Sequence, residues 1–149
     1  MKLILKAITT DDTVQRLGLQ EHSEAAMVLE HQMEYYQVIG YNPPWISYFA
    51  FINDDIVGVC SFKGSPRNGR VELAYFTFPA YESKGIGTLM CAKLCEIALR
   101  EDPNVILTAR TLPHFNASTS ILKKNGFICS GTVVDPEDGE VWEWVRNDR

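Results

Sequence analysis

Two glycines at the start of a predicted helix form the clearest candidate binding site in the sequence. Gly85 and Gly87 come shortly after a predicted strand that ends at Phe78 and Pro79. Glycine lets the backbone approach a phosphate closely, and the amides and dipole of a helix N-terminus attract negative charge. The spacing indicates a phosphate-binding loop, although a helix start whose glycines only allow close packing is the simpler alternative. The third glycine of a dinucleotide-binding fingerprint is absent, which disfavours a nucleotide-binding protein.

The elements that position this loop follow from the spacing of apolar residues. Asp12 followed by Gln15 resembles a capping box and predicts a helical stretch after it. No linker or internal repeat interrupts the pattern, so residues 1–149 are expected to form one α+β domain. Further helices are predicted at 23–38, 85–100 and 116–125, and strands at 3–7, 46–52, 56–63, 71–78, 105–111, 127–134 and 140–145.

The composition is that of a globular protein, since 46% of the 149 residues are hydrophobic and 22% are charged. The formal net charge of −5 argues against a partner of duplex nucleic acid, where phosphate neutralisation supplies most of the affinity. No apolar run approaches the roughly 20 residues of a membrane span, and the first residues predict a strand rather than a signal peptide. The four cysteines have no CxxC spacing, so we expect no metal site and a reducing, cytoplasmic location.

A second segment, which follows another predicted strand, strengthens the interpretation of the glycine loop. Residues 83–88 are Ser-Lys-Gly-Ile-Gly-Thr, residues 116–118 are Asn-Ala-Ser, and residues 122–127 are Leu-Lys-Lys-Asn-Gly-Phe. In this order they resemble the pyrophosphate loop and the second cofactor segment of the GNAT-superfamily acetyltransferases.

The resemblance extends upstream. Residues 45–48, 58–64 and 71–75 are similar to the branch that contains ribosomal-protein and small-amine N-acetyltransferases. The similarity covers roughly residues 45–130 and implies a single GNAT-like acetyltransferase domain. Such a domain has a central sheet, mixed and mostly antiparallel, flanked by helices.

The resemblance also implies acetyl-CoA as cosubstrate and assigns its contacts. The main chain of Phe76 and Thr77 would pair with the pantetheine arm, as an added strand does. Asn116 would contact the pantetheine or the acetyl end, and Ser118 lies one helical step further into the same catalytic site. We expect Gly87 to be small because a Cβ atom there would press into the pyrophosphate position. The pyrophosphate would be held by the main-chain amides of Lys84, Gly85, Ile86, Gly87 and Thr88.

Two positions depart from the family pattern. Glu82 stands where the family usually has Gln or Arg, so a side-chain contact to the cosubstrate is not implied there. Leu122 stands where many members have the tyrosine that protonates the leaving thiolate. The sequence therefore identifies no proton donor for the thiolate.

Glu72 is the candidate base. It shares one face of the predicted strand with Ala74, Phe76 and Phe78 because side chains alternate along a strand. Acetyl transfer requires an amine without its proton, and a carboxylate can accept that proton directly or through water. The alternative is a carboxylate at the strand edge that is paired with a nearby lysine or arginine.

Aromatic residues crowd the region before the first predicted hairpin, and we expect them to contact the acceptor. In the GNAT family the corresponding region forms the wall of the acceptor site, and aromatic rings suit an ammonium or an apolar group. The alternative is that they cover the sheet edge as part of the core. These residues are Tyr35, Tyr36, Tyr41 and Trp45.

Three histidines and two tryptophans are also notable in the sequence. His114 lies close to Asn116 and is either an active-site imidazole or a solvated loop residue. His22 and His31 are expected at the surface. Trp142 and Trp144 alternate on the last predicted strand and are expected on one buried face of the sheet.

Together these observations predict an acetyl-CoA-dependent N-acetyltransferase that acts on a primary amine of a small metabolite, an antibiotic or a protein N-terminus. A strand amide near Phe76 or Thr77 would stabilise the oxyanion. Direct transfer is expected, because no cysteine has a histidine at the spacing that a ping-pong scheme requires. The alternative, left open by Leu122, is a non-catalytic module that binds an acyl-CoA as a sensor or regulatory subunit. The expected partner is a small-molecule or peptide amine, with no nucleic acid or membrane, and a homodimer is an open option.

Overall fold

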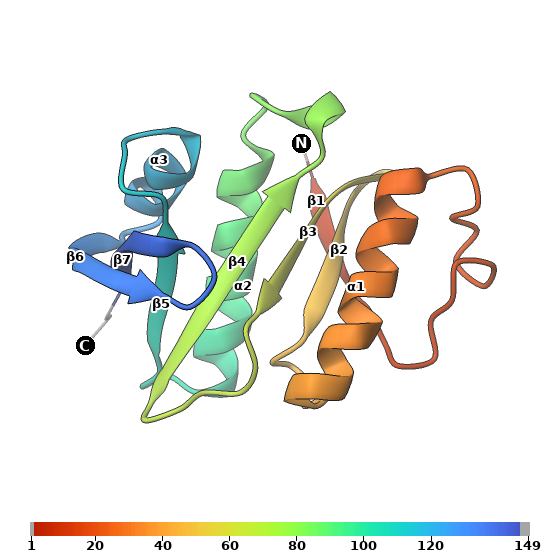
Figure 1. The fold of residues 1–149 in the computed structure, drawn as a ribbon. Helices are drawn as coiled ribbons and strands as arrows, with labels where there is room; N and C mark the ends of the chain where they lie inside the picture. The colour runs from red at the N-terminus through yellow and green to blue at the C-terminus, as the bar shows by residue number, and fades with distance from the viewer. Residues whose placement is uncertain (1, 147–149) are drawn as a thin grey trace.

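Seven strands form one sheet, which the computed structural model shows within its described residues, 2–146. They are β1 (Leu3–Ala7), β2 (Ser47–Ile52), β3 (Asp55–Phe62), β4 (Arg70–Thr77), β5 (Ile106–Thr111), β6 (Ile128–Asp135) and β7 (Gly139–Arg146). Their spatial order is β1-β2-β3-β4-β5-β7-β6 (Figure 1). Neighbouring strands are antiparallel except β4 and β5, which run parallel. The predicted sheet, mixed and mostly antiparallel, is confirmed.

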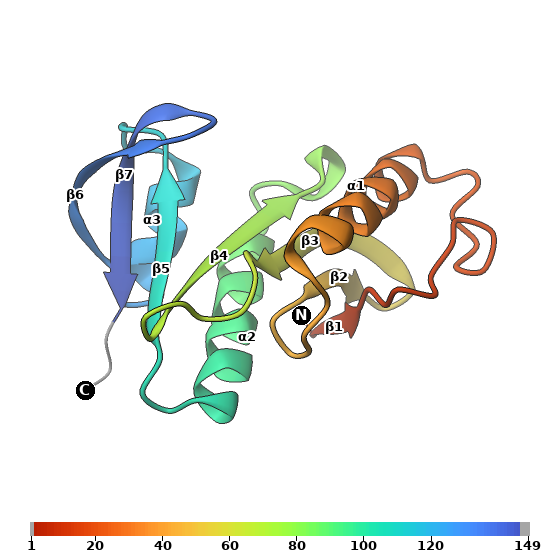
Figure 2. The ribbon, with the colours of Figure 1, turned by 60° about the horizontal axis from the view of Figure 1, so that its bottom comes forward.

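Helices cover both faces of the sheet. They are α1 (Ser23–Ile39), α2 (Ile86–Glu101) and α3 (Ala117–Lys124), with a short 3-10 helix η1 (Pro79–Tyr81) between β4 and α2. Figures 1 and 2 show α1 on one face and α2 with α3 on the other. The apolar stripe predicted for α2 is buried, because Ile86, Met90, Leu94 and Ala98 recur at helical spacing and are at most 1% exposed.

The sheet forks between β4 and β5. Only Arg70–Glu72 pairs with Ile106–Thr108, and from Leu73 to Thr77 the only partner of β4 is β3. Figure 2 shows β4 and β5 diverging beyond this point. One edge of a central strand is therefore left without a strand partner at its C-terminal end.

The chain before α1 differs from the prediction. No helix lies between Asp12 and α1; residues 10–21 form turns, and Gly18 has a φ of 68°. The carboxylate of Asp12 accepts a hydrogen bond of 2.8 Å from the amide of Thr9, which lies before it in the chain, so it does not cap a helix after it. All other predicted strands and helices are found, each within one residue of its expected bounds. Within the described part of the chain, no helix has both the length and the apolar character that a bilayer crossing requires.

Candidate active site

The N-terminus of α2 is suited to an anion. Its N-cap, Gly85, has a φ of 80°, and neither a side-chain cap nor an acidic residue occupies the first turn. The first amides of a helix have no partner within the helix, so those of Ile86, Gly87 and Thr88 are available to an oxyanion. A Cβ atom added at Gly85 would meet nothing within 4 Å, so the approach to these amides is open. Lys84 is exposed beside them, with its Nζ 5.8 Å from the centroid of the Tyr81 ring.

Gly87 has a packing reason to be small, in addition to the expected one. It is buried, and an added Cβ atom would lie 2.5 Å from Cδ1 of Ile121 on α3 and 3.6 Å from Oγ1 of Thr77. The nearest obstacle within the protein is thus a side chain of the neighbouring helix. Glycine at this position lets α2 and α3 approach each other, a relationship between distant residues that spacing alone does not reveal.

The unpaired edge of β4 presents main-chain groups to the fork. The amide of Phe78 donates to the carbonyl of Val57 in β3 at 2.9 Å. Because hydrogen-bonding residues alternate along an antiparallel ladder, the main chain of Phe76 is also directed to β3, whereas that of Thr77 faces the fork. Of the two residues predicted to pair with pantetheine, Thr77 therefore has the accessible amide and carbonyl. The residues of this edge are Leu73, Tyr75 and Thr77.

Asn116 is the N-cap of α3. Its Oδ1 accepts from the amide of Thr119 at 3.1 Å, and Oγ1 of Thr119 accepts from the amide of Asn116 at 2.9 Å. This reciprocal pair is a capping box. The exposed side chain of Asn116 thus has a structural role, and its Nδ2 atom is left for any contact with a cosubstrate.

Ser118, in the first turn of α3, lies against a tyrosine that the sequence analysis did not select. Oη of Tyr75 donates to the carbonyl of Ser118 at 3.0 Å and lies 3.4 Å from its Oγ. Burial raises the pKa of Tyr75, so its hydroxyl keeps its proton at neutral pH. Leu122 is fully buried. A tyrosine hydroxyl is therefore present at the start of α3, but it comes from Tyr75 of β4 and not from position 122.

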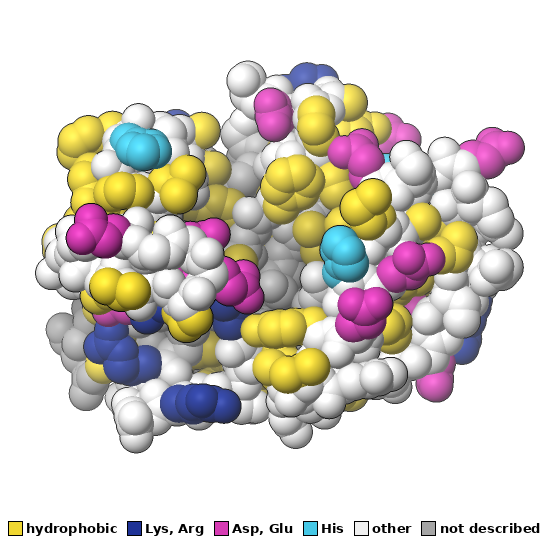
Figure 3. Space-filling view, in the orientation of Figure 1, with side chains coloured by type: hydrophobic (Ala, Val, Ile, Leu, Met, Phe, Trp, Pro, Cys, Tyr) yellow, Lys and Arg dark blue, Asp and Glu magenta, His cyan; other side chains and the backbone are white. Residues whose placement is uncertain are grey.

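A cleft of about 1080 Å³ lies between α1, the first residues of β4 and β5, and the turn between β6 and β7. In Figure 3 the surface is hollowed between α1 and that turn. Two of the predicted site residues, Glu72 and Tyr35, line the cleft. The cleft thus meets the fork at Glu72, which is the last residue of β4 that pairs with β5.

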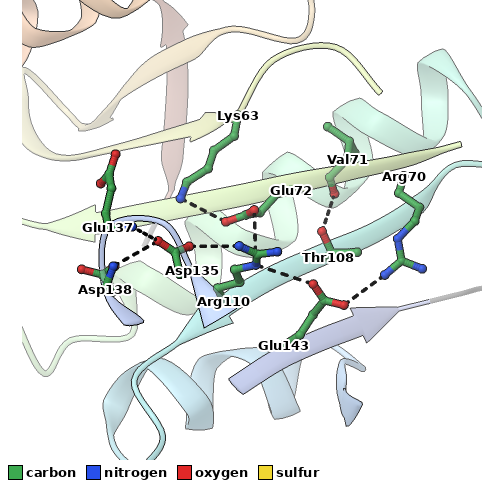
Figure 4. A network of polar contacts seen from close by, with 10 residues as sticks. All are labelled: Lys63, Arg70, Val71, Glu72, Thr108, Arg110, Asp135, Glu137, Asp138 and Glu143. Carbon is green, nitrogen blue, oxygen red and sulfur yellow. Dashed lines mark hydrogen bonds and ion pairs between the residues drawn. The ribbon is translucent and has the colours of Figure 1, made fainter. Parts of the chain in front are cut away.

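Ion pairs cross the floor of this cleft, with Arg110 of β5 at their centre (Figure 4). Its Nη1 lies 3.0 Å from Oδ2 of Asp135, and its Nε lies 3.6 Å from Glu143 and 3.9 Å from Glu72. This Nε is buried without a hydrogen bond. Glu72 therefore faces the cleft and is also ion-paired, as the alternative to a catalytic base had it. The outer pairs are Lys63 with Glu72 at 3.0 Å and Arg70 with Glu143 at 3.3 Å.

Neighbouring groups keep both Arg110 and Asp135 in their charged forms. The amide of Glu137, the Arg110 guanidinium and the amide of Asp138 lower the pKa of Asp135 to about 2. The hydrogen bond to Asp135 in turn raises the pKa of Arg110. Both groups are therefore ionised at neutral pH, and the turn after β6 is held to β5.

The predicted aromatic residues separate into two groups. Tyr35 lines the cleft, and burial raises its pKa. Tyr36 is buried, and its hydroxyl donates to the carbonyl of Ile8 at 2.8 Å and accepts from the amide of Ser47 at 2.9 Å. The Tyr41 ring lies 5.1 Å from that of Tyr36, and the Trp45 ring lies 5.2 Å from that of Phe62. Only Tyr35 of the four is thus placed at the cleft, whereas the others pack in or on the core.

The cysteines lie away from the cleft. Cys60, Cys91 and Cys95 are buried and form no disulfide with a described residue, and none of them lines the cleft. Burial raises the pKa of Cys60, and a hydrogen bond with Cys95 is the main cause that raises the pKa of Cys91. The thiols of Cys60 and Cys91 therefore stay protonated at neutral pH and are poor nucleophiles.

The histidines and tryptophans have separate roles. His114 is exposed, His31 lines the cleft, and Nδ1 of His22 caps α1 by accepting from the amide of Ala25 at 3.2 Å. Trp144 is 1% exposed and Trp142 is half-buried. The predicted buried face of the last strand is thus confirmed for Trp144 and in part for Trp142.

The sequence analysis missed most of the charged residues of the cleft. Arg110, Asp135 and Glu143 come from three strands, and no local pattern brings them together. The Asn68-Gly69 dipeptide flanked by arginines was a readable signal of a tight turn, which places two arginines next to each other.

Comparison with known proteins agrees with this geometry. A solved structure of RimL, the ribosomal L7/L12 alpha-N-protein acetyltransferase in complex with coenzyme A, is 17% identical, with a TM-score of 0.73 over 99% of this chain and 94% of that one. Aminoglycoside acetyltransferase AAC(6')-Ib, in complex with coenzyme A and kanamycin, is 21% identical, with a TM-score of 0.72 over 99% and 95%. The Campylobacter jejuni N-acetyltransferase PseH, in complex with acetyl coenzyme A, is 15% identical, with a TM-score of 0.70 over 99% and 100%. No curated protein sequence matches the chain significantly.

These structural similarities establish the fold, and a match to a family profile establishes the family. The profile of the acetyltransferase (GNAT) domain matches residues 2–128, which is most of the chain. The match spans β1 through α3 and includes the glycine loop, the fork and both cofactor segments that carried the resemblance. The chain belongs to the GNAT family of acetyltransferases, which use acetyl-CoA.

Proposed function

We propose that this protein transfers the acetyl group of acetyl-CoA directly to a primary amine. The observation that carries the proposal is the fork between β4 and β5, which connects the cleft at Glu72 with the uncapped N-terminus of α2. A reaction between two substrates needs two sites that meet. Here the stretch from Glu72 to Thr77 joins the cleft for the amine to the site for the cosubstrate.

The residues present fit the two polar parts of acetyl-CoA. The free main-chain groups of the β4 edge would bind the amides of its arm as an added strand. The amides from Lys84 to Thr88 would hold its pyrophosphate, since no carboxylate occupies the first turn of α2. Glu82 is exposed before this loop and provides no donor from its side chain, so the main chain supplies the contacts.

Glu72 is proposed to take the proton from the incoming ammonium, directly or through water. The neutral nitrogen then attacks the thioester carbon, so that an N–C bond forms and the C–S bond breaks. An amide on the free edge of β4, that of Thr77 or Tyr75, is placed to stabilise the developing oxyanion. Glu72 passes this first proton to solvent and then accepts the second proton from the nitrogen as it becomes the amide. Its Oε1 is 3.9 Å from Nε of Arg110, while Oε2 is held by Lys63.

Tyr75 is the proposed donor of the proton that the leaving thiolate takes up. Its hydroxyl is protonated at neutral pH and fixed at the first turn of α3 by Ser118. Tyr75→Phe keeps the ring and removes only the hydroxyl. We expect it to lower turnover without weakening acetyl-CoA binding, and an unchanged turnover would assign the proton to water.

Buried thiols support direct transfer rather than an acetyl-cysteine intermediate. The three buried cysteines lie outside the cleft, and Cys129 is exposed on β6. Variants with serine at these positions should therefore keep their activity. The reduced thiols also accord with the predicted cytoplasmic location, and the homodimer stays a prediction.

The acceptor is proposed to be a small-molecule or peptide amine. RimL is a ribosomal-protein acetyltransferase and AAC(6')-Ib an aminoglycoside acetyltransferase, so closely similar folds serve both kinds of acceptor. The test is to incubate the protein with acetyl-CoA and a panel of primary amines, to titrate released CoA thiol, and to identify the acetylated product by mass.

The competing function is a sensor that binds acyl-CoA without turnover. Calorimetry with acetyl-CoA and with CoA distinguishes it, because a sensor binds and releases no thiol with any amine. Binding together with product formation supports the enzyme, and binding without product across the panel supports the sensor. An absence of binding contradicts both.

A further inference from the structure

Two arginines lie side by side at the end of the cleft farther from the fork. The amide of Arg67 donates to the carbonyl of Arg70 at 2.8 Å, and the amide of Arg70 donates to the carbonyl of Arg67 at 3.0 Å. Between them Asn68 and Gly69 have φ values of 53° and 74°, as a two-residue hairpin turn requires. Residues that exchange both hydrogen bonds stand directly opposite each other, with side chains on the same face. Both arginines line the cleft.

This arrangement places two positive guanidinium groups side by side, and only one of them is neutralised by an ion pair in the described part of the chain. Like charges directly opposite on an antiparallel pair are destabilising. Arg70 is paired with Glu143 at 3.3 Å, whereas Arg67 forms no ion pair with any residue of the described range. One guanidinium in the cleft thus lacks a counter-ion among the residues that the structure describes.

The other charges of the cleft are already paired. The three carboxylates on its floor, Glu72, Asp135 and Glu143, each lie within 4.0 Å of a lysine or arginine. Glu137 remains, and Figure 4 shows its carboxylate directed away from Arg110. A polycationic acceptor would therefore find few free carboxylates here, while an anionic group would find a free arginine.

We propose that Arg67 and Arg70 bind an anionic group of the acceptor, a carboxylate or a phosphate, while its amine is at the fork. The inference rests on the proposed function and adds the class of acceptor. Guanidinium groups suit this task, since their N–H donors match the oxygens of carboxylate and phosphate.

The strand sets the distance between the two groups of the acceptor. At about 3.3 Å per residue, Arg70 is roughly 10 Å from Leu73 and roughly 23 Å from Thr77 along β4. Because arginine side chains are long, a guanidinium group that leans toward the fork reduces the distance between the bound anion and the amine. An acceptor with an anion three or more extended residues from its amine would fit, whereas a free amino acid would be too short.

Acetylation kinetics with matched acceptors test the proposal. Tetraglycine and tetraglycinamide have the same amine and differ in the terminal charge, and glycine with glycinamide supplies the short pair. We expect kcat/KM for tetraglycine to exceed that for its amide by about three- to tenfold, and the preference to fall as salt is raised. Gly-Gly-Gly-phosphoserine amide against Gly-Gly-Gly-serine amide distinguishes phosphate from carboxylate.

Substitution of the exposed arginine assigns the effect. Arg67→Gln should abolish the preference of the long pair and leave glycine and glycinamide unaffected. Arg67→Glu should favour the amide. Arg100→Gln, an exposed arginine at the end of α2 and outside the cleft, is the matched control and should change neither.

The possible failures are distinct. If amides and acids are acetylated equally by the wild-type protein, the anion site is wrong while the proposed function stands. A preference that survives Arg67→Gln likewise overturns it. If acetyl-CoA binds and no amine is acetylated, the proposed function fails, and this inference fails with it.

Discussion

Arg110 donates a hydrogen bond of 3.0 Å from Nη1 to Oδ2 of Asp135, which ties β5 to the turn between β6 and β7. The same carboxylate accepts through Oδ1 from the amides of Glu137 and Asp138 at 2.9 and 3.2 Å. One side chain thus shapes the turn and holds it to the floor of the cleft. The geometry of one cleft wall therefore depends on the ionised form of Asp135.

This pair predicts a pH dependence of stability. The pKa of Asp135 is lowered to about 2, below the roughly 3.9 of an unfolded aspartate. A lowered pKa stabilises the fold above about pH 4, and this contribution is lost as the pH falls from about 4 toward about 2. Asp135→Asn should therefore lower Tm at neutral pH, and the difference from wild type should shrink below pH 4.

Thermal denaturation followed by circular dichroism between pH 2 and pH 7 measures this difference. Asp54→Asn, an exposed carboxylate outside the cleft, is the control and should show no such trend. A Tm difference for Asp135→Asn that is constant over the whole range would show that the charge of Asp135 contributes nothing.

Glu72→Gln should lower turnover by about 10²–10⁴-fold at neutral pH with little change in acetyl-CoA affinity. An amine with a pKa of about 10.4, as for lysine, is mostly protonated there, so a base is needed. The loss should diminish as the pH rises, because more of the amine is then neutral. Initial rates from pH 6 to pH 10, with circular dichroism to verify folding, provide the measurement.

Lys63→Gln separates the base from the ion pair. It removes the 3.0 Å partner of Glu72 and keeps the carboxylate. If Glu72 acts as the base, this variant should retain most of the turnover that Glu72→Gln loses. Equal losses in both variants, with no change in pH profile, would assign Glu72 a structural role.

Gly87→Val should destabilise the fold by about 1–3 kcal/mol, since overpacking of a well-packed contact costs that much. The added atoms meet Cδ1 of Ile121. Combination with Ile121→Ala removes the obstacle and should restore part of the stability and of the acetyl-CoA affinity. Calorimetry and thermal melts of the two single variants and the double variant form the cycle. Simple additivity of the two losses would refute the contact as the reason for glycine.

Asn116→Ala should cost about 0.5–2 kcal/mol of stability, because it removes an N-cap. For a protein of this size that is a fall in Tm of about 2–4 °C for each kcal/mol. Thr119→Val breaks the other half of the same capping box and is the matched control. If Nδ2 of Asn116 also contacts acetyl-CoA, only Asn116→Ala raises its KM.

The sequence predicted the elements of this fold well and the cleft poorly, for physical reasons. The strand at residues 71–78 and the helix at 85–100 follow from local periodicity, and the glycine loop between them has a local signature. Arg110 meets Asp135 and Glu143 only because β5, β6 and β7 are neighbours in the sheet. Tyr36 and Tyr35 are adjacent in sequence, yet helix geometry directs one to the core and the other to the cleft.

The fork in the sheet has a consequence for how the family tolerates mutation. The free edge of β4 offers amides and carbonyls, which every residue but proline provides in the same form. Binding of such a ligand depends on the path of the backbone and little on the side chains along it. A change of the Thr77 side chain would then leave its amide and carbonyl available, as long as the strand keeps its course.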